Sequence, residues 1–381
     1  MTAPACGAAP AAAAAVQVAG PVPPVAAPPV TLLSHEEILR RLRETDPARL
    51  EDLWEQADTV RREHVGDQVH LRGLVEISNH CVRLCGYCGI RGGNTSVDRY
   101  RMTEDEIVGC AREALAYGWG TTVLQAGEDP GLTREFISGV VRRIKAETGL
   151  AVTLSLGERS LEDVRAWREA GADRYLVRFE TSDPALYRRI HPPGPGRRGD
   201  SHPNDRLDLL RHLRDMGYEI GSGIMVGIPG QTYETVARDI ETFRALDLDM
   251  IGIGPYIPHP GTPLGSGGSA PPPTDQVPND ELMVYRAVAV TRMVCPEANI
   301  PSTTALATIN KESGRELGLQ RGANIVMPNL TPPKYRVLYE IYPDKACINE
   351  TADMGRGRLV GRIESIGRSA GSGPGGRRRA G

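Results

Sequence analysis

Short apolar runs alternate with helical patterns from about residue 70 to residue 329, and no other feature of the chain restricts its fold as strongly. Alternating strand and helix predicts parallel βα units. Eight such units close an α/β fold of the complete (β/α)8 TIM barrel type. A doubly wound open sheet is the alternative, but no Gly-x-Gly-x-x-Gly turn follows the first strand. The eight expected strands are Val69–Ile77, Thr121–Gln125, Ala151–Leu156, Arg174–Glu180, Glu219–Val226, Met250–Tyr256, Asn299–Thr303 and Ala323–Met327.

The segments outside the barrel differ from it in composition. Residues 1–30 are dominated by Ala and Pro, and the repeated prolines interrupt any helix, so this composition predicts a disordered leader. Residues 31–68 predict an N-terminal helical segment, residues 69–350 the barrel, and residues 351–381 a disordered Gly/Arg-rich tail. A net charge of -3 argues against a nucleic-acid partner. We find no signal peptide and no membrane-spanning apolar segment, so a cytoplasmic protein is expected.

Three cysteines, Cys81, Cys85 and Cys88, lie within eight residues directly after the first expected strand. Cysteine thiolates are the usual ligands of iron-sulfur clusters, and a four-iron cluster normally takes four of them. Three ligands would leave one iron open to a substrate or cofactor. A structural zinc site with His80 or His64 as fourth ligand is the alternative, but it usually comes as two paired half-sites, and no second Cys-x-x-Cys is present.

Polar side chains follow the other expected strands at the same end. Because the active site of such a barrel lies at the carboxyl ends of its strands, we expect these residues to surround the cysteine loop. An ordinary polar turn at Gly127–Asp129 and a buried ion pair between Arg178 and Glu180 are the alternatives. The candidates are Gly127, Glu128, Thr153, Ser155, Arg178, Glu180, Thr304 and Met327.

The spacing Cys81-x3-Cys85-x2-Cys88, with Tyr87 before the last cysteine, resembles the signature of the radical S-adenosylmethionine (SAM) family. Further segments resemble the HydE-type maturases of FeFe-hydrogenases within that family. The resemblance extends from about residue 33 to residue 350, in separate blocks. These blocks are Tyr100–Thr103, Leu124–Pro130, Thr153–Glu158, Met225–Thr232 and Val326–Pro332.

The resemblance implies one 4Fe-4S cluster, held by the three cysteines, and SAM. It also implies an adenosyl radical that acts on a cysteine-bound iron carbonyl cyanide complex, toward the di-iron subcluster of a hydrogenase. HydG-like and HydF-like maturases and a ferredoxin or flavodoxin are the implied partners. The implied SAM contacts are Tyr87, Gly127, Glu128, Ser155, Glu180 and Arg206, and the implied substrate cavity contains Thr153, Arg178, Thr304 and Met327.

Three alternative functions remain at this point. A biotin synthase would need further cysteines on its inner strands, where this chain has Thr153 and Ser155. A methylornithine synthase acts on lysine and would need acidic side chains deep in the cavity, which Arg178 disfavours. A non-catalytic carrier of an iron-sulfur cluster would not need Glu180 and Arg206 beside the open iron.

Overall fold

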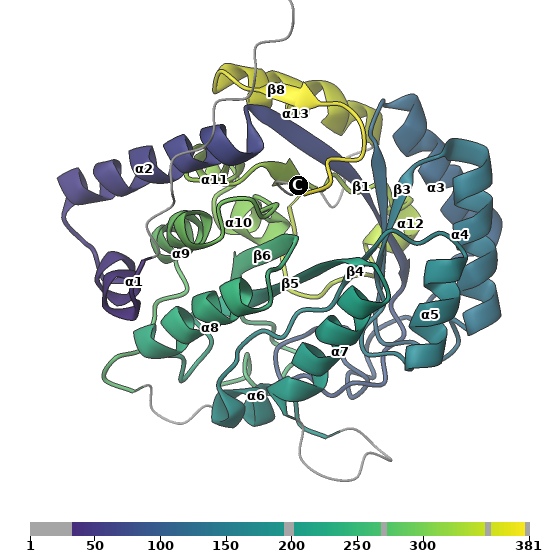
Figure 1. The fold of residues 1–381 in the computed structure, drawn as a ribbon. Coiled ribbons are helices and arrows are strands. Elements are labelled where there is room, and N and C mark those ends of the chain that lie inside the picture. The colour runs from purple at the N-terminus through teal and green to yellow at the C-terminus, as the bar shows by residue number, and fades with distance from the viewer. Residues whose placement is uncertain (1–32, 194–201, 268–272, 347–351, 378–381) are drawn as a thin grey trace, which may run out of the picture. The chain divides into compact units, whose positions relative to one another are not determined.

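A computed structural model describes residues 33–193, 202–267, 273–346 and 352–377; the expected leader at residues 1–30 lies outside these ranges. Its strands are parallel and follow the order β6-β5-β4-β3-β2-β1-β7. The strands curve around a common interior (Figure 1). Their bounds are β1 Gln68–Ser78, β2 Thr121–Ala126, β3 Ala151–Ser155, β4 Arg174–Leu176, β5 Glu219–Val226, β6 Met250–Pro255 and β7 Ile325–Val326.

The sheet closes through the segment at residues 299–302, which lies between β6 and β7. Met250 and Ile253 of β6 form single parallel bridges to Asn299 and Ser302, and Pro301 bridges to Ile325 of β7. The prediction of a (β/α)8 barrel is therefore confirmed. The expected seventh strand, Asn299–Thr303, contributes single bridges to the ring rather than a regular ladder.

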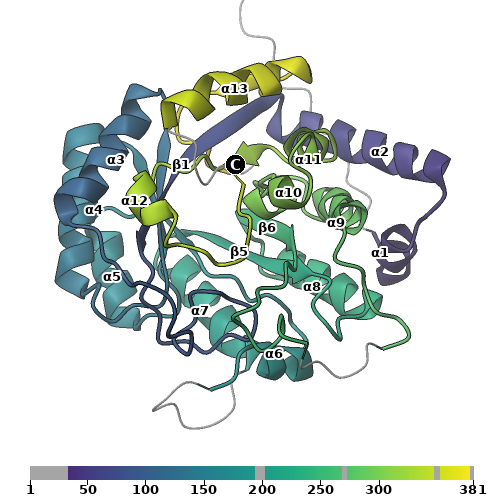
Figure 2. The ribbon, with the colours of Figure 1, turned by 180° about the vertical axis from the view of Figure 1, so that it is seen from behind.

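Helices cover the outside of the barrel (Figures 1 and 2). Thr103 and Glu106 form a reciprocal capping box at the start of α3. Gly149 ends α4 with φ 66°, a left-handed conformation that favours glycine. Among the described residues, no helix has the length and apolar character needed to cross a bilayer. The helices after β1 to β6 are α3 Glu104–Ala116, α4 Arg134–Thr148, α5 Leu161–Glu169, α6 Pro184–Ile190, α7 Pro203–Asp215, α8 Tyr233–Ala245 and α9 Glu281–Val294.

Shorter helices and the two terminal regions complete the fold. Helices α1 (His35–Leu42) and α2 (Pro47–Val65) precede the barrel, and both pack against α9. Eleven of the fourteen residues of α9 are buried, because this helix lies between the barrel and α2. The remaining short helices are α10 Thr304–Ile309, α11 Gly314–Gln320 and α12 Pro333–Arg336.

The C-terminal region differs from the disordered tail expected at residues 351–381. It contains helix α13 (Ala352–Ser365) and strand β8 (Ser369–Gly371), which pairs with the start of β1. Arg368, 7 % exposed, donates to the carbonyl oxygens of Leu319 and Ala323 at 2.9 and 2.8 Å. The Gly/Arg composition suggests a solvated segment, but these tertiary hydrogen bonds order it.

Residues 374–377 then cross the amino-terminal end of the barrel. Thr121 Oγ1 donates to the carbonyl of Pro374 at 2.9 Å, and Arg72 Nη2 donates to that of Gly375 at 2.8 Å. Arg377 pairs with Glu297 at 3.0 Å. Arg72 is 1 % exposed, and burial lowers its pKa to about 9. The segment therefore supplies a hydrogen-bond acceptor to a buried cation at the end of the barrel opposite the cysteine loop.

Truncation after Gly371 is expected to destabilise the protein. The change removes the carbonyl acceptor of Arg72 Nη2 and the ion pair of Arg377. Loss of a buried hydrogen bond of a charged group costs about 1–3 kcal/mol. The midpoint of thermal unfolding, followed by circular dichroism, should fall. The matched control is truncation after Arg377, which keeps all of these contacts. Equal midpoints for the two truncated proteins would contradict the assigned role of the segment.

Candidate active site

The cysteine loop follows β1 and is fixed by hydrogen bonds to its own backbone and to α6. Gly86 N donates to the carbonyl of Ile190, and Gly92 N donates to that of Arg83, both at 2.8 Å. Arg91 Nε donates to the carbonyl of Cys85 at 3.1 Å. Such bonds hold the three thiols in a defined loop conformation without using the sulfur atoms themselves.

The three cysteines line a cavity of about 340 Å³ at the carboxyl ends of the strands. Residues from the loops after several strands complete its walls, as the barrel prediction requires. The structure thus brings together all but one of the residues expected at the site. Those that line the cavity are Cys81, Cys85, Cys88, Tyr87, Gly127, Glu128, Ser155, Arg178, Glu180, Arg206, Thr304 and Met327.

Thr153 is the exception, because it lies outside the lining of this cavity. It lines a separate small cavity in the barrel, together with Arg72 and Arg174. In the register of the sheet it is opposite Arg174, the first residue of β4, so it lies toward the amino end of the barrel. The structure therefore does not place Thr153 on the wall of the cysteine cavity. Ser155, two residues further along β3, reaches the cavity.

Burial governs the acidity of the three thiols. It raises the pKa of Cys81, raises that of Cys85 to about 11, and raises that of Cys88 further. The unliganded thiols are therefore protonated at neutral pH. Because metals bind the thiolate form, loading of the site releases protons.

Gly127 has a packing role in addition to its place in the cavity wall. A Cβ atom at this position would lie 2.8 Å from Cβ of Cys81 and closer still to the carbonyl oxygen of His80. The amide of Gly127 donates to the carbonyl of Ser78 at 3.1 Å. The turn after β2 can therefore approach the first cysteine only with glycine at this position.

Four charged side chains form a network along one side of the cavity. Arg83 lies 3.2 Å from a carboxylate oxygen of Glu158 and 3.8 Å from one of Glu128. Arg206 Nε donates to Glu158 at 2.9 Å, and its Nη1 donates to the carbonyl of Arg178. Burial raises the pKa of Glu128. Glu128 and Arg206 were expected at the site from the sequence. Arg83 and Glu158 were not, because their pairing depends on contacts between distant loops.

Arg178 and Glu180 form the ion pair that the sequence allowed as an alternative. Nε and Nη2 of Arg178 donate to the two carboxylate oxygens of Glu180 at 2.8 and 3.0 Å, and Nη2 also donates to the carbonyl of Ile224 at 2.6 Å. The φ of Glu180 is 62°, which is unusual for a residue other than glycine. Such strain persists where the surrounding structure fixes it and is frequent at functional sites.

The segment at residues 339–345 also lines the cavity, and sequence reasoning missed it. Tyr339, Tyr342 and Lys345 contribute to the lining, and Lys345 forms a buried ion pair with Glu76 of β1. The carbonyl of Ile341 accepts a hydrogen bond from Gly89 of the cysteine loop at 3.0 Å. The segment follows the last barrel strand and lacks hydrophobic periodicity, so no sequence signal placed it over the cavity.

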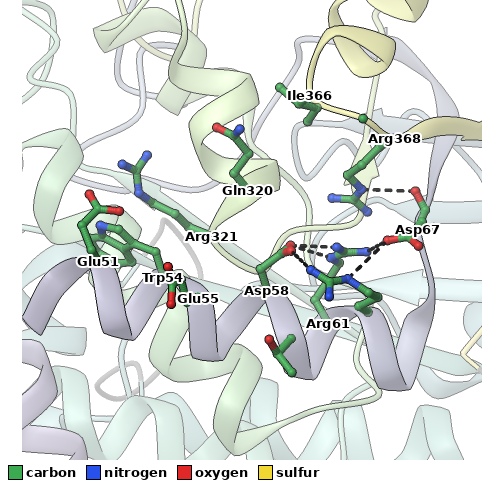
Figure 3. A pocket seen from close by; sticks show the side chains of 13 residues that line it. Glu51, Trp54, Glu55, Asp58, Arg61, Asp67, Gln320, Arg321, Ile366 and Arg368 are labelled. Carbon is green, nitrogen blue, oxygen red and sulfur yellow. Dashed lines mark hydrogen bonds and ion pairs between the residues drawn. The ribbon is translucent and has the colours of Figure 1, made fainter.

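A larger cleft of about 690 Å³ lies between α2, α11 and the residues around Arg368, but its composition suggests no reaction chemistry. Figure 3 shows Arg61 between Asp58 and Asp67, to which it is paired at 2.8 Å in each case. Arg321 stacks over the ring of Trp54 at 4.9 Å. The charges of this cleft largely neutralise one another, and the cysteines lie elsewhere.

The cysteine cavity has the features that an open iron-sulfur cluster and a zwitterionic cofactor require. Three thiols line its wall, so one iron of a four-iron cluster would lack a protein ligand. Glu180 offers a carboxylate for a cationic group, and Arg206 a guanidinium for a carboxylate. His191 adds no positive charge near Arg206, because burial and the guanidinium of Arg206 hold its pKa well below the ordinary value. The residues present therefore fit both groups.

Comparison with known proteins agrees with this geometry. Residues 75–243 match the model of the radical SAM superfamily. The chain is 45 % identical over 329 residues to the [FeFe] hydrogenase maturase subunit HydE of Thermotoga maritima, covering 86 % of this chain and 89 % of that protein. It is 28 % identical over 310 residues to a biotin synthase of a Picosynechococcus species, covering 77 % of this chain and 78 % of that one.

A solved structure gives the same result for the fold. The crystal structure of methylornithine synthase (PylB) matches with a TM-score of 0.76 and 25 % identity, over 90 % of this chain and 95 % of that one. Membership of the family implies a 4Fe-4S cluster and SAM. The cysteine signature, the barrel and these matches lead to one conclusion: the chain belongs to the radical SAM superfamily and is a HydE-like enzyme.

Proposed function

We propose that this chain matures the active site of an FeFe-hydrogenase, as the HydE protein does. The observation that carries the proposal is the 45 % identity to HydE across 89 % of that protein, together with the three cysteines on the cavity wall. Cys81, Cys85 and Cys88 would hold a single 4Fe-4S cluster. When bound, the reduced cluster and SAM supply a carbon radical for the reaction.

The other cavity residues would bind SAM and orient it. Glu180 would offer its carboxylate to a cationic group of SAM, and Arg206 would donate to the carboxylate of SAM. Glu158 accepts a hydrogen bond from Nε of Arg206 at 2.9 Å and so holds the guanidinium in place. Gly127 permits the close approach of the adjacent turn. Tyr339, Ile341, Tyr342 and Lys345 of the segment at residues 339–345 complete the cavity wall.

The proposed substrate is a small cysteine-bound iron carbonyl cyanide complex, converted toward the di-iron subcluster. Five cationic side chains and three carboxylates line the cavity, so the lining carries a positive surplus that suits an anionic complex. HydG-like and HydF-like maturases would supply and receive the intermediates, and a ferredoxin or flavodoxin would reduce the cluster.

The methylornithine synthase alternative is disfavoured by the charge of the cavity. The ammonium group of a lysine substrate needs a carboxylate partner. Within the described lining, Glu76 pairs with Lys345, Glu128 with Arg83, and Glu180 with Arg178. A biotin synthase reaction would need further cysteine ligands, and the described lining contains cysteines only from the loop after β1.

A maturation assay tests the proposal. The reconstituted protein is added to an apo-FeFe-hydrogenase with HydG, HydF, SAM and a reductant, and hydrogen evolution is measured; a parallel reaction contains lysine and SAM. We expect hydrogenase activity that depends on the added protein, and no methylornithine. Conversion of lysine to methylornithine, or an inactive hydrogenase alongside a positive control with Thermotoga maritima HydE, would overturn the proposed function.

A further inference from the structure

The cations that line the cysteine cavity differ in whether they have an anionic partner. Arg83, Arg178, Arg206 and Lys345 each pair with a carboxylate within the described part of the chain. Arg315 lines the same cavity and has no such pair among the described residues. Glu158, which lies outside the lining, also pairs with Arg83 and Arg206. With Glu158 counted, the positive surplus of the cavity is concentrated at the guanidinium of Arg315.

Arg315 lies in the first turn of α11, beside the wall formed by residues 302–304. Its carbonyl oxygen accepts a hydrogen bond from Ser302 Oγ at 2.9 Å, which fixes the position of its backbone. The side chain is half-buried, and its Nε is shielded from solvent without a hydrogen-bond partner in the described residues. A shielded donor without an acceptor is costly, so the site favours a ligand that supplies one.

Arg178 was expected from the sequence to bind the anionic substrate, but it has fewer free hydrogen-bond donors than Arg315. Its Nε and Nη2 already donate to Glu180 and to the carbonyl of Ile224. The planar fork of Arg315, by contrast, retains its donors. An arginine fork matches the two oxygens of a carboxylate in a bidentate pair.

We propose that Arg315 binds the α-carboxylate of the substrate, and that this enzyme selects ligands that carry a free carboxylate. The identity of the ligand rests on the proposed function, in which the carboxylate is that of the cysteine attached to iron. The threonine-containing wall at residues 303–304 then faces the remainder of the complex. Arg315 binds the carboxylate and thereby orients the substrate, and it takes no part in bond cleavage.

Equilibrium binding of L-cysteine and of its methyl ester tests the proposal. Both are titrated calorimetrically into the cluster-loaded protein in the presence of SAM. The ester removes the carboxylate charge from the ligand, as Arg315→Gln removes the guanidinium from the protein. We expect the wild type to bind L-cysteine about tenfold to a hundredfold more tightly than the ester, as for a charge-assisted pair.

The variants separate recognition of the carboxylate from a general loss of structure. Arg315→Gln should bind acid and ester alike, and Arg315→Lys should restore part of the preference. Arg165→Gln, an exposed arginine on α5, is the matched control and should retain the full preference. A wild type without preference for the acid, or an Arg315→Gln protein that keeps it, would overturn the proposal. Because binding is read without turnover, failure of the maturation assay leaves this result interpretable.

Discussion

Replacing Cys85 with serine is expected to lower the iron content of the anaerobically reconstituted protein to about a tenth of the wild-type value or below, because a three-ligand cluster that loses one thiolate is poorly held. Wild-type protein should contain about four iron atoms per chain, since among the described cysteines only the loop at residues 81–88 has cluster spacing. Cleavage of SAM should fall with the iron. Chemical analysis of iron and sulfide provides the measurement.

The matched control is Cys295→Ser, which changes a cysteine at the end of α9, outside the cavity lining. This variant should keep the wild-type iron content. Full iron retention in Cys85→Ser would remove the loop as the cluster site. About eight iron atoms per wild-type chain, with a second paramagnetic signal, would show that the assignment of a single cluster is wrong.

Glu180→Gln is expected to weaken SAM binding about tenfold to a hundredfold, because a charge-assisted hydrogen bond contributes about 1.5–3 kcal/mol. The amide keeps the size of the side chain but removes the charge that we propose faces the cofactor. The cluster should remain, since Glu180 is not one of its ligands. The dissociation constant of SAM, measured by equilibrium dialysis beside the iron content, separates the two effects.

Glu162→Gln controls for the loss of a carboxylate at a side chain that is 74 % exposed, and it should bind SAM like the wild type. An unchanged SAM affinity in Glu180→Gln would exclude this carboxylate from the cofactor site. Loss of iron together with affinity would instead show that the Arg178–Glu180 pair supports the cluster loop.

The sequence predicted the barrel because its strands are apolar runs separated by capped helices, and these local signals survive in the fold. It predicted β4 too long, to Glu180, whereas regular pairing in the structure ends at Leu176. The positive φ of Glu180 explains part of this difference. The prediction failed at the C-terminal region, where hydrogen bonds from Arg368 and Arg72 to distant backbone order a segment of low hydrophobicity.

In the candidate site, too, features set by local sequence were predictable, and features set by contacts between distant segments were not. The cysteine loop and the residues after β2 and β4 could be placed because barrel topology brings strand ends together. Thr153 was misplaced because alternation along a strand indicates the inward face but not the depth. Glu158, Lys345 and Arg315 depend on pairing, or on its absence, between segments far apart in the chain, and a single sequence does not record such contacts.

The formation of 5′-deoxyadenosine from SAM tests whether this chain is a radical SAM enzyme. The cluster-loaded wild-type protein is reduced under anaerobic conditions, mixed with SAM, and analysed by liquid chromatography, with Cys85→Ser as the matched blank. We expect deoxyadenosine and methionine in equal amounts from the wild type and none above background from the variant. A fully loaded, reduced wild-type protein that binds SAM but releases no deoxyadenosine would contradict it.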